Sequence, residues 1–197
     1  MVSDESRECV IIDCGAYYEA ERDAIGSYIS GHGLRPVHLL ATHGHLDHNF
    51  GNAAVYRLYG LRVEVCGEDQ ELVEHLEEQA RSILGIPFSE EQVMAGRLLG
   101  EGDYAGFGSH TLQVLKTPGH SHGSCLFYCA EEHLVFTGDT LFRMSIGRTD
   151  FAEGSWKEME RSLEQVVRRL PEDTTVLPGH GPQSTIADEL RYNPYLR

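Results

Sequence analysis

Short apolar runs alternate along the chain with amphipathic segments. Strand-like runs occupy residues 8–13, 37–41, 62–65, 111–116, 125–129, 134–137 and 175–177, each bounded by turn-forming residues. Apolar positions recur at helical spacing over 19–30, 49–59, 69–84 and 155–170. This alternation predicts an α/β or α+β fold, and the closely spaced strands between 111 and 137 predict a meander.

The amphipathic segment beginning at Ser155 has the best-defined ends. Ser155 and Glu158 have the spacing of a capping box, and Pro171 follows the last apolar position. One helical face carries Trp156, Met159, Leu163, Val166, Val167 and Leu170. This spacing predicts that Trp156 packs in the core. Residues 85–109 are glycine-rich and weakly periodic, which predicts a loop with a short helix at 90–95.

Length and charge narrow the class of protein. A chain of 197 residues suits one domain, so we expect a single domain over 1–197. The formal charge is −15, from 16 basic and 31 acidic residues. Proteins bind nucleic-acid phosphates through Lys and Arg, and the sequence has no basic cluster. It also has no apolar run long enough to span a membrane. We therefore expect a small-molecule substrate, no nucleic-acid or membrane partner, and a monomer or homodimer.

The cysteines and the start of the chain bear on localisation. The chain has five cysteines, an odd number, and no C-x-x-C pair. This usage is typical of buried thiols in a reducing compartment. The sequence does not open on a signal-peptide apolar region. Together these features predict a cytoplasmic protein.

A histidine-rich turn is the strongest chemical signal. It contains His43, His45, Asp47 and His48, between a predicted strand and a predicted helix. Imidazole and carboxylate are ligands that borderline divalent metals prefer. At this spacing the side chains do not share one helical or strand face, but they converge if the segment is a turn wrapped around an ion. We therefore interpret the segment as a metal turn.

Three further potential metal ligands lie in glycine-containing turns, each after a strand-like run. They are His120, Asp139 and His180. Residues of this kind at successive strand ends favour one assembled site over scattered histidines. The isolated histidines are interpreted instead as surface or satisfied core residues; they are His32, His38, His75, His110 and His133.

The spacing His43-x-His45-x-Asp47-His48, followed by His120, Asp139 and His180, resembles the metallo-β-lactamase superfamily. Within it, residues 117–120, 138–142, 145–150 and 178–182 are similar to the short glyoxalase II-like hydrolases. The resemblance implies a four-layer αββα sandwich. Those hydrolases have one more strand before the one at 8–13, and we expect this first N-terminal strand to be absent here, leaving an open sheet edge.

The resemblance also implies a ligand set. His43, His45 and His120 would hold one divalent ion, Asp47, His48 and His180 a second, and Asp139 would bridge both. Zinc is the expected metal, and iron or manganese also suits these ligands. The resemblance further implies that Asp13 braces the metal turn.

The candidate catalytic residues are Asp47, Asp139 and Arg148. The role of Arg148 is open between two interpretations. Its guanidinium either grips a substrate carboxylate or pairs with Asp150 or Asp13 and shapes its loop.

This resemblance implies a dinuclear hydrolase of a small acyl thioester, such as a hydroxyacyl-glutathione, that acts through a metal-bridging hydroxide. One alternative is a persulfide dioxygenase with a single iron on His43, His120 and Asp139. Lactonases and small phosphodiesterases share the ligand set. A non-catalytic binding module is a further class; it would be signalled by a lost ligand, and every ligand position is filled.

Overall fold

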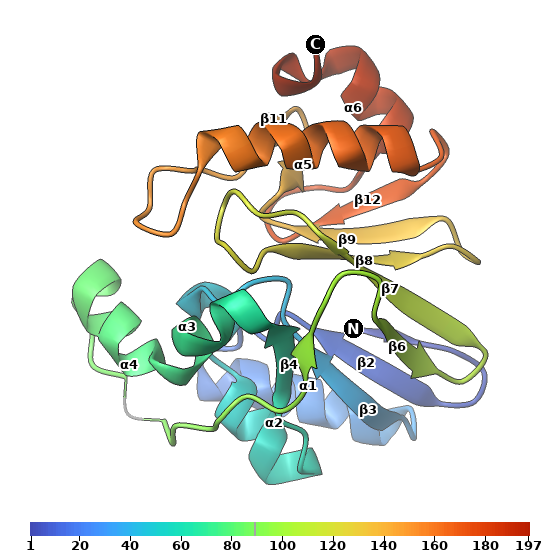
Figure 1. The fold of residues 1–197 in the computed structure, drawn as a ribbon. Helices are drawn as coiled ribbons and strands as arrows, with labels where there is room; N and C mark the ends of the chain where they lie inside the picture. The colour runs from blue at the N-terminus through green and yellow to red at the C-terminus, as the bar shows by residue number, and fades with distance from the viewer. Residues whose placement is uncertain (89) are drawn as a thin grey trace. The chain divides into compact units, whose positions relative to one another are not determined.

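The computed structural model describes residues 1–88 and 90–197 (Figure 1). These residues form two compact units. Unit 1 comprises Met1–Leu99 with Gly106–Ser109, and unit 2 comprises Gly100–Ala105 with His110–Arg197. The expectation of a single domain over 1–197 stays a prediction.

Unit 1 is built on a mainly parallel sheet. In the described part of the chain its strands pair in the order β1 (Val2–Ser3), β2 (Glu8–Ile12), β3 (Arg35–Leu40), β4 (Val63–Cys66) and β5 (Leu98–Leu99). Strands β2 to β5 run parallel to their neighbours. Helices α1 (Glu19–Gly31) and α2 (Asn52–Tyr59) form the crossovers, as the helical periodicity predicts. The carboxyl ends of β2 and β3 therefore meet at one edge.

The expectation that the first strand is absent is wrong in one respect. β1 pairs antiparallel with β2, with Val2 opposite Val10. The chain reverses between them because Asp4 accepts hydrogen bonds from the Ser6 and Arg7 backbone N–H groups, through its carboxylate and its carbonyl oxygen respectively. The sheet edge is thus occupied by a strand of two residues, a short edge of the kind that limits association.

The segment expected to be one helix over 69–84 is divided. It consists of η2 (Gly67–Asp69), α3 (Gln70–Glu74), α4 (Leu76–Gln79) and the π-helical turn η3 (Ala80–Leu84). The break is at His75, whose backbone leaves the helical region at φ −129° and ψ 40°. Residues 85–109 contain β5 and part of unit 2's sheet as well as loop, and 90–95 are not helical. Ser89, within that predicted loop, lies outside the described residues.

Unit 2 contains the second sheet except for residues 106–107, which belong to unit 1. Among the described residues its strand order is β13 (Ser184–Thr185), β12 (Thr175–Pro178), β9 (Leu134–Gly138), β8 (Cys125–Cys129), β7 (His110–Lys116) and β6 (Tyr104–Phe107). Strands β7, β8 and β9 pair antiparallel in succession, which confirms the predicted meander. A small hairpin, β10 (Leu141–Phe142) and β11 (Ser145–Ile146), follows β9.

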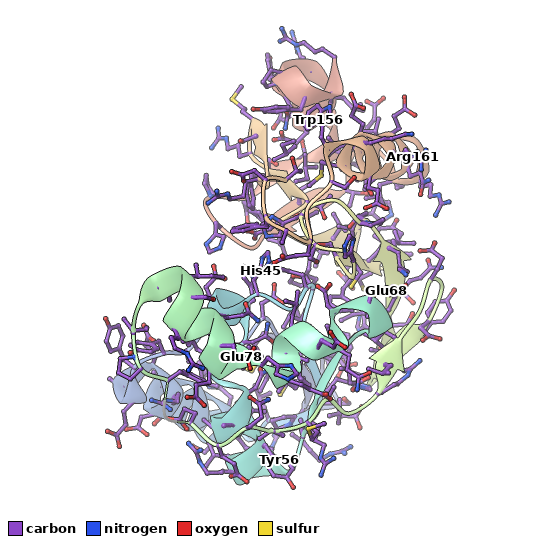
Figure 2. All side chains as sticks on the ribbon, turned by 60° about the vertical axis from the view of Figure 1, so that its left-hand side comes forward. His45, Tyr56, Glu68, Glu78, Trp156 and Arg161 are labelled. Atoms are coloured by element: carbon purple, nitrogen blue, oxygen red, sulfur yellow. The ribbon has the colours of Figure 1, made fainter. Side chains whose placement is uncertain are left out.

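The long helix α5 (Trp156–Arg169) begins where the capping pattern predicts, because the Ser155 hydroxyl accepts a hydrogen bond from the Glu158 N–H at 3.3 Å. Its apolar face packs into the unit 2 core from Met159 onward. The prediction for Trp156, which is labelled in Figure 2, is wrong: the residue is 47% exposed. Its ring lies edge-on to that of Tyr195. The apolar stripe therefore extends one turn beyond the buried cluster. The chain ends with α6 (Ile186–Tyr192) and η4 (Pro194–Leu196).

All five cysteines lie in the described residues; they are buried and form no disulfide. This agrees with the expectation of buried thiols. Across the residues that the structure describes, no helix is both long and apolar enough to span a membrane. Cytoplasmic localisation stays a prediction.

Candidate metal centre

The metal turn lies at the carboxyl end of β3, in unit 1. His43, His45 and His48 are at most 5% exposed, whereas the Asp47 side chain is 52% exposed. The His43 ring centroid lies 4.7 Å from that of His45 and 4.2 Å from that of His48. His45 is labelled in Figure 2. Unit 1 therefore gathers four of the predicted ligands in one turn.

Buried polar side chains hold the backbone of this turn. The Asn49 amide donates to two of its carbonyl oxygens, at 2.7 and 3.1 Å. Gln79 donates to the Gly44 carbonyl at 3.0 Å and accepts from the Leu46 N–H at 3.1 Å. Asp69 accepts from the Gly44 N–H at 2.8 Å. Sequence reasoning missed these residues, because amides and carboxylates at such separations along the chain carry no periodic signal.

Asp13 fixes the orientation of two histidines. Its carboxylate accepts from the Thr42 N–H at 2.7 Å, the Thr42 hydroxyl at 2.8 Å and His48 Nδ1 at 3.0 Å. His43 Nδ1 lies 3.1 Å from the same hydroxyl, whose proton is already donated to Asp13. Both Nδ1 atoms therefore act as donors, which leaves each Nε2 lone pair available as a ligand. This agrees with the expectation that Asp13 braces the turn.

Unit 2 contributes the other three predicted ligands. His120 follows β7, Asp139 follows β9 and His180 follows β12. Asp139 Oδ2 lies 3.6 Å from His120 Nε2 and 3.8 Å from His180 Nε2. These distances exceed those of hydrogen bonds. They are close to the separation of about 3.4 Å expected for two ligand atoms that share a tetrahedral ion.

A backbone carbonyl orients His120. Its Nδ1 lies 2.8 Å from the Arg148 carbonyl oxygen and donates to it, so Nε2 faces Asp139 as an acceptor. Gly147 allows the chain to pass this closely. A Cβ at Gly147 would lie 1.8 Å from the Asp139 carbonyl oxygen and 3.1 Å from His120 Nδ1. A side chain is therefore excluded at this position.

The Arg148 side chain is engaged with Asp150. Its Nε and Nη2 atoms lie 2.6 and 2.7 Å from the two Asp150 carboxylate oxygens, and its guanidinium lies over the Phe151 ring. The hydrogen bonds from Arg148 hold the pKa of the Asp150 carboxyl below its usual value. Of the two interpretations of Arg148, the structure contains the pairing with Asp150. The role as a substrate clamp stays a prediction, and a substrate carboxylate would have to compete with Asp150.

The donor chemistry fits borderline divalent cations. His43, His48 and His120 each present Nε2 with Nδ1 held by an oxygen acceptor. Carboxylates lie beside them in each unit, Asp47 in unit 1 and Asp139 in unit 2. Imidazole and carboxylate together suit zinc, iron and manganese. How the two sets share ions stays a prediction.

Comparison with known proteins places these observations in a family. The sequence model of the metallo-beta-lactamase superfamily matches residues 1–180. The hydroxyacylglutathione hydrolase GloC of Haemophilus influenzae is 34% identical over 197 residues, covering 100% of this chain and 91% of that protein. A probable metallo-hydrolase of Bacillus subtilis, YqgX, is 33% identical over 198 residues, covering 100% and 90%.

Solved structures are similar over nearly the whole chain. The B3 metallo-beta-lactamase BLEG-1 has a TM-score of 0.88 at 32% identity, covering 99% of this chain and 91% of that one. TTHA1623, solved in a di-iron-bound form, has a TM-score of 0.82 at 37% identity, covering 94% and 88%. ETHE1 from Myxococcus xanthus has a TM-score of 0.78 at 29% identity, covering 98% and 76%. These matches confirm the expected fold class.

Proposed function

Because the chain belongs to the metallo-β-lactamase superfamily, we propose that it is a dinuclear metal-dependent hydrolase of small acyl thioesters, such as a hydroxyacyl-glutathione. The observation that carries the proposal is the orientation of three histidines. Nδ1 of His43, His48 and His120 is held by an oxygen acceptor in each case. Each Nε2 is thereby oriented as a metal ligand, because a ligating histidine characteristically donates its other ring N–H to an oxygen.

The ligand assignment is part of this proposal. His43, His45 and His120 would hold one ion, and Asp47, His48 and His180 the other, with Asp139 shared. The short Nε2 to Oδ2 separations around Asp139 support its shared position. Zinc is the proposed metal. Iron is the alternative metal to test, since the similar TTHA1623 was solved in a di-iron-bound form.

When bound, two divalent ions polarise a substrate carbonyl and lower the pKa of water to about 7. The chain's own residues supply the rest. Asp13 and the Arg148 carbonyl keep the histidine rings in one tautomer. The imidazoles of His43, His48 and His120 are themselves buried away from bulk water. Asp47, which is half exposed, is placed to accept a proton at its carboxylate.

The thioester class is proposed on chemical grounds. A thiolate is a good leaving group at neutral pH, because the pKa of a free thiol is about 8.5. Its departure requires no dedicated general acid, and the proposed site consists of metal ligands and the groups that orient them. The similarity to GloC supports the same class. A small-molecule substrate also suits a chain with a formal charge of −15.

Metal analysis combined with a substrate panel tests the proposal. Protein purified without added metal should contain close to two ions per chain, and the zinc form should hydrolyse a hydroxyacyl-glutathione or a simpler thioester without oxygen. The similarity to ETHE1 makes persulfide oxidation the alternative to include. Oxygen consumption with glutathione persulfide by the iron form, with no thioester hydrolysis by the zinc form, would overturn the hydrolase assignment. Lactones and phosphodiesters in the same panel test the remaining alternatives.

A further inference from the structure

Helix α6 and the residue that follows it present two buried polar side chains to the β10–β11 hairpin. Glu189 is 1% exposed and Asn193, which follows the helix, is 0% exposed. Glu189 Oε2 accepts from the Met144 N–H and from Asn193 Nδ2, both at 2.8 Å. Asn193 Nδ2 also lies 3.0 Å from the Ser145 carbonyl oxygen and 3.5 Å from that of Phe142. Every one of these contacts to the hairpin is made to its backbone, so together they fix its path.

Packing alone does not account for these residues. A buried carboxylate costs free energy unless it is hydrogen-bonded, and Glu189 Oε1 makes no hydrogen bond within the described part of the chain. The neighbouring Ile186 and Leu190 already pack against the unit 2 core. An apolar residue at position 189 would therefore cost less free energy to bury. What the carboxylate adds is a specific acceptor for the hairpin.

The hairpin turn requires such an acceptor. Met144 has a φ of +58°, in the left-handed region that a non-glycine residue adopts only at a cost in free energy. A residue in this conformation persists where surrounding contacts hold it. Glu189 provides that contact directly at the Met144 N–H.

The hairpin leads directly to two predicted ligands. It begins two residues after Asp139, and it returns the chain to Gly147, which lies against the Asp139 carbonyl. The next residue is Arg148, whose carbonyl accepts from His120 Nδ1 at 2.8 Å. A shift of the hairpin would therefore move the acceptor that sets the His120 ring and the backbone beside Asp139.

We propose that Glu189 and Asn193 are positioning residues that set the metal affinity of His120 and Asp139 by holding the β10–β11 hairpin. This inference rests on the proposed function only in taking His120 and Asp139 as metal ligands. It adds to the site two residues, about fifty positions along the chain from Asp139, that do not touch a metal or a substrate.

The first experiment compares metal affinity in matched variants. Co²⁺ affinity is measured by competition with a chelator, and the visible absorption of bound Co²⁺ reports ligand geometry. Glu189→Leu should bind Co²⁺ at least about tenfold more weakly, with an altered absorption band, as expected when a group that orients a ligand is lost. Glu189→Gln keeps a carbonyl acceptor and should restore affinity to within about threefold of wild type. Asp188→Asn, at the exposed neighbouring position, is the control.

Wild-type affinity and absorption in a folded Glu189→Leu variant would overturn the inference, as would an equal loss in Glu189→Gln. If Glu189→Leu does not fold, hydrogen exchange of the wild-type protein tests the inference instead. By reciprocity, Co²⁺ binding should slow exchange of the Met144 amide, and an unchanged rate would overturn the inference. A wild-type protein that binds no Co²⁺ would instead contradict the proposed function itself. Thioester activity is not needed for any of these readouts.

Discussion

Gly147 lies so close to Asp139 that a Cβ at position 147 would come within 1.8 Å of the Asp139 carbonyl oxygen. The contact joins the strand end that carries Asp139 to the loop that carries the Arg148 carbonyl. The same Cβ would lie 3.1 Å from His120 Nδ1. One backbone position thus constrains two predicted ligands of unit 2.

Gly147→Ala should therefore destabilise the protein by about 3 kcal/mol or more, because backbone must move to relieve the overlap. Metal content should fall with it. Gly26→Ala is the matched control: Gly26 lies within α1, and the nearest atoms to its added Cβ are 3.8 and 3.9 Å away. That substitution should stabilise by about 0.5–1 kcal/mol through helix propensity. Urea unfolding of both variants measures the difference, and equal stabilities would contradict the expectation.

Asp13→Asn tests how the histidines of unit 1 are oriented. Asp13 has a φ of +51°, which Asn tolerates as well as Asp does, so the backbone should be preserved. The amide cannot accept from the Thr42 N–H, the Thr42 hydroxyl and His48 together as the carboxylate does. Metal affinity should fall about 10- to 100-fold, measured by chelator competition. Asp23→Asn, on α1, should leave it unchanged; the same affinity in both variants would refute the bracing role.

His38 should make stability depend on pH. Its hydrogen bond to Glu64 raises its pKa above the ordinary value, against the opposing effect of burial. A raised folded pKa means that protonation stabilises the fold. This contribution should be complete below the unfolded pKa of about 6.5 and lost as pH rises through the higher folded value. Unfolding free energies of wild type and His38→Gln should converge over that range, and a constant difference from pH 5 to 9 would contradict this expectation.

Much of the architecture follows from the sequence. The parallel strands of unit 1 and the meander of unit 2 were recognisable because apolar runs of strand length are bounded by turn residues. The prediction of one continuous helix over 69–84 is wrong, because apolar periodicity does not reveal a single residue such as His75 whose backbone leaves the helical region. β10 and β11 were missed because strands of two residues are too short to show alternation.

The residues of the candidate site likewise fall into those that the sequence reveals and those that it does not. Ligand types stand out in sequence because histidine and aspartate in glycine turns after strands form a recognisable pattern. Supporting residues such as Gln79 and Glu189 do not, because their partners are backbone atoms distant in sequence. The sequence leaves two interpretations of Arg148 open, and the fold brings both Asp150 carboxylate oxygens within 2.7 Å of its guanidinium.

Arg148→Ala tests the role that remains a prediction. If the guanidinium leaves Asp150 to grip a substrate carboxylate, KM should rise about tenfold or more for thioesters that carry a carboxylate, because one charge-assisted pair is lost. KM for neutral thioesters and kcat should change little. Asp150→Asn is the companion variant: without its partner, Arg148 should bind the carboxylate more readily and lower KM. An equal rise in KM for both substrate classes would show that Arg148 only shapes its loop.

The number of bound ions gives the sharpest test of the ligand set. Asp139 Oδ2 lies within 3.8 Å of both His120 Nε2 and His180 Nε2, so Asp139→Ala should lose occupancy at both ions. His180→Ala should lose only one, retaining about one ion per chain, and its thioesterase rate should fall about 10²-fold or more with the lost electrostatic stabilisation. His122→Ala is the control, because His122 is two residues from His120 in sequence but its side chain is 57% exposed. It should keep both ions and full activity. Metal analysis after gel filtration measures occupancy; two retained ions in Asp139→Ala, or an ion lost in His122→Ala, would overturn the assignment.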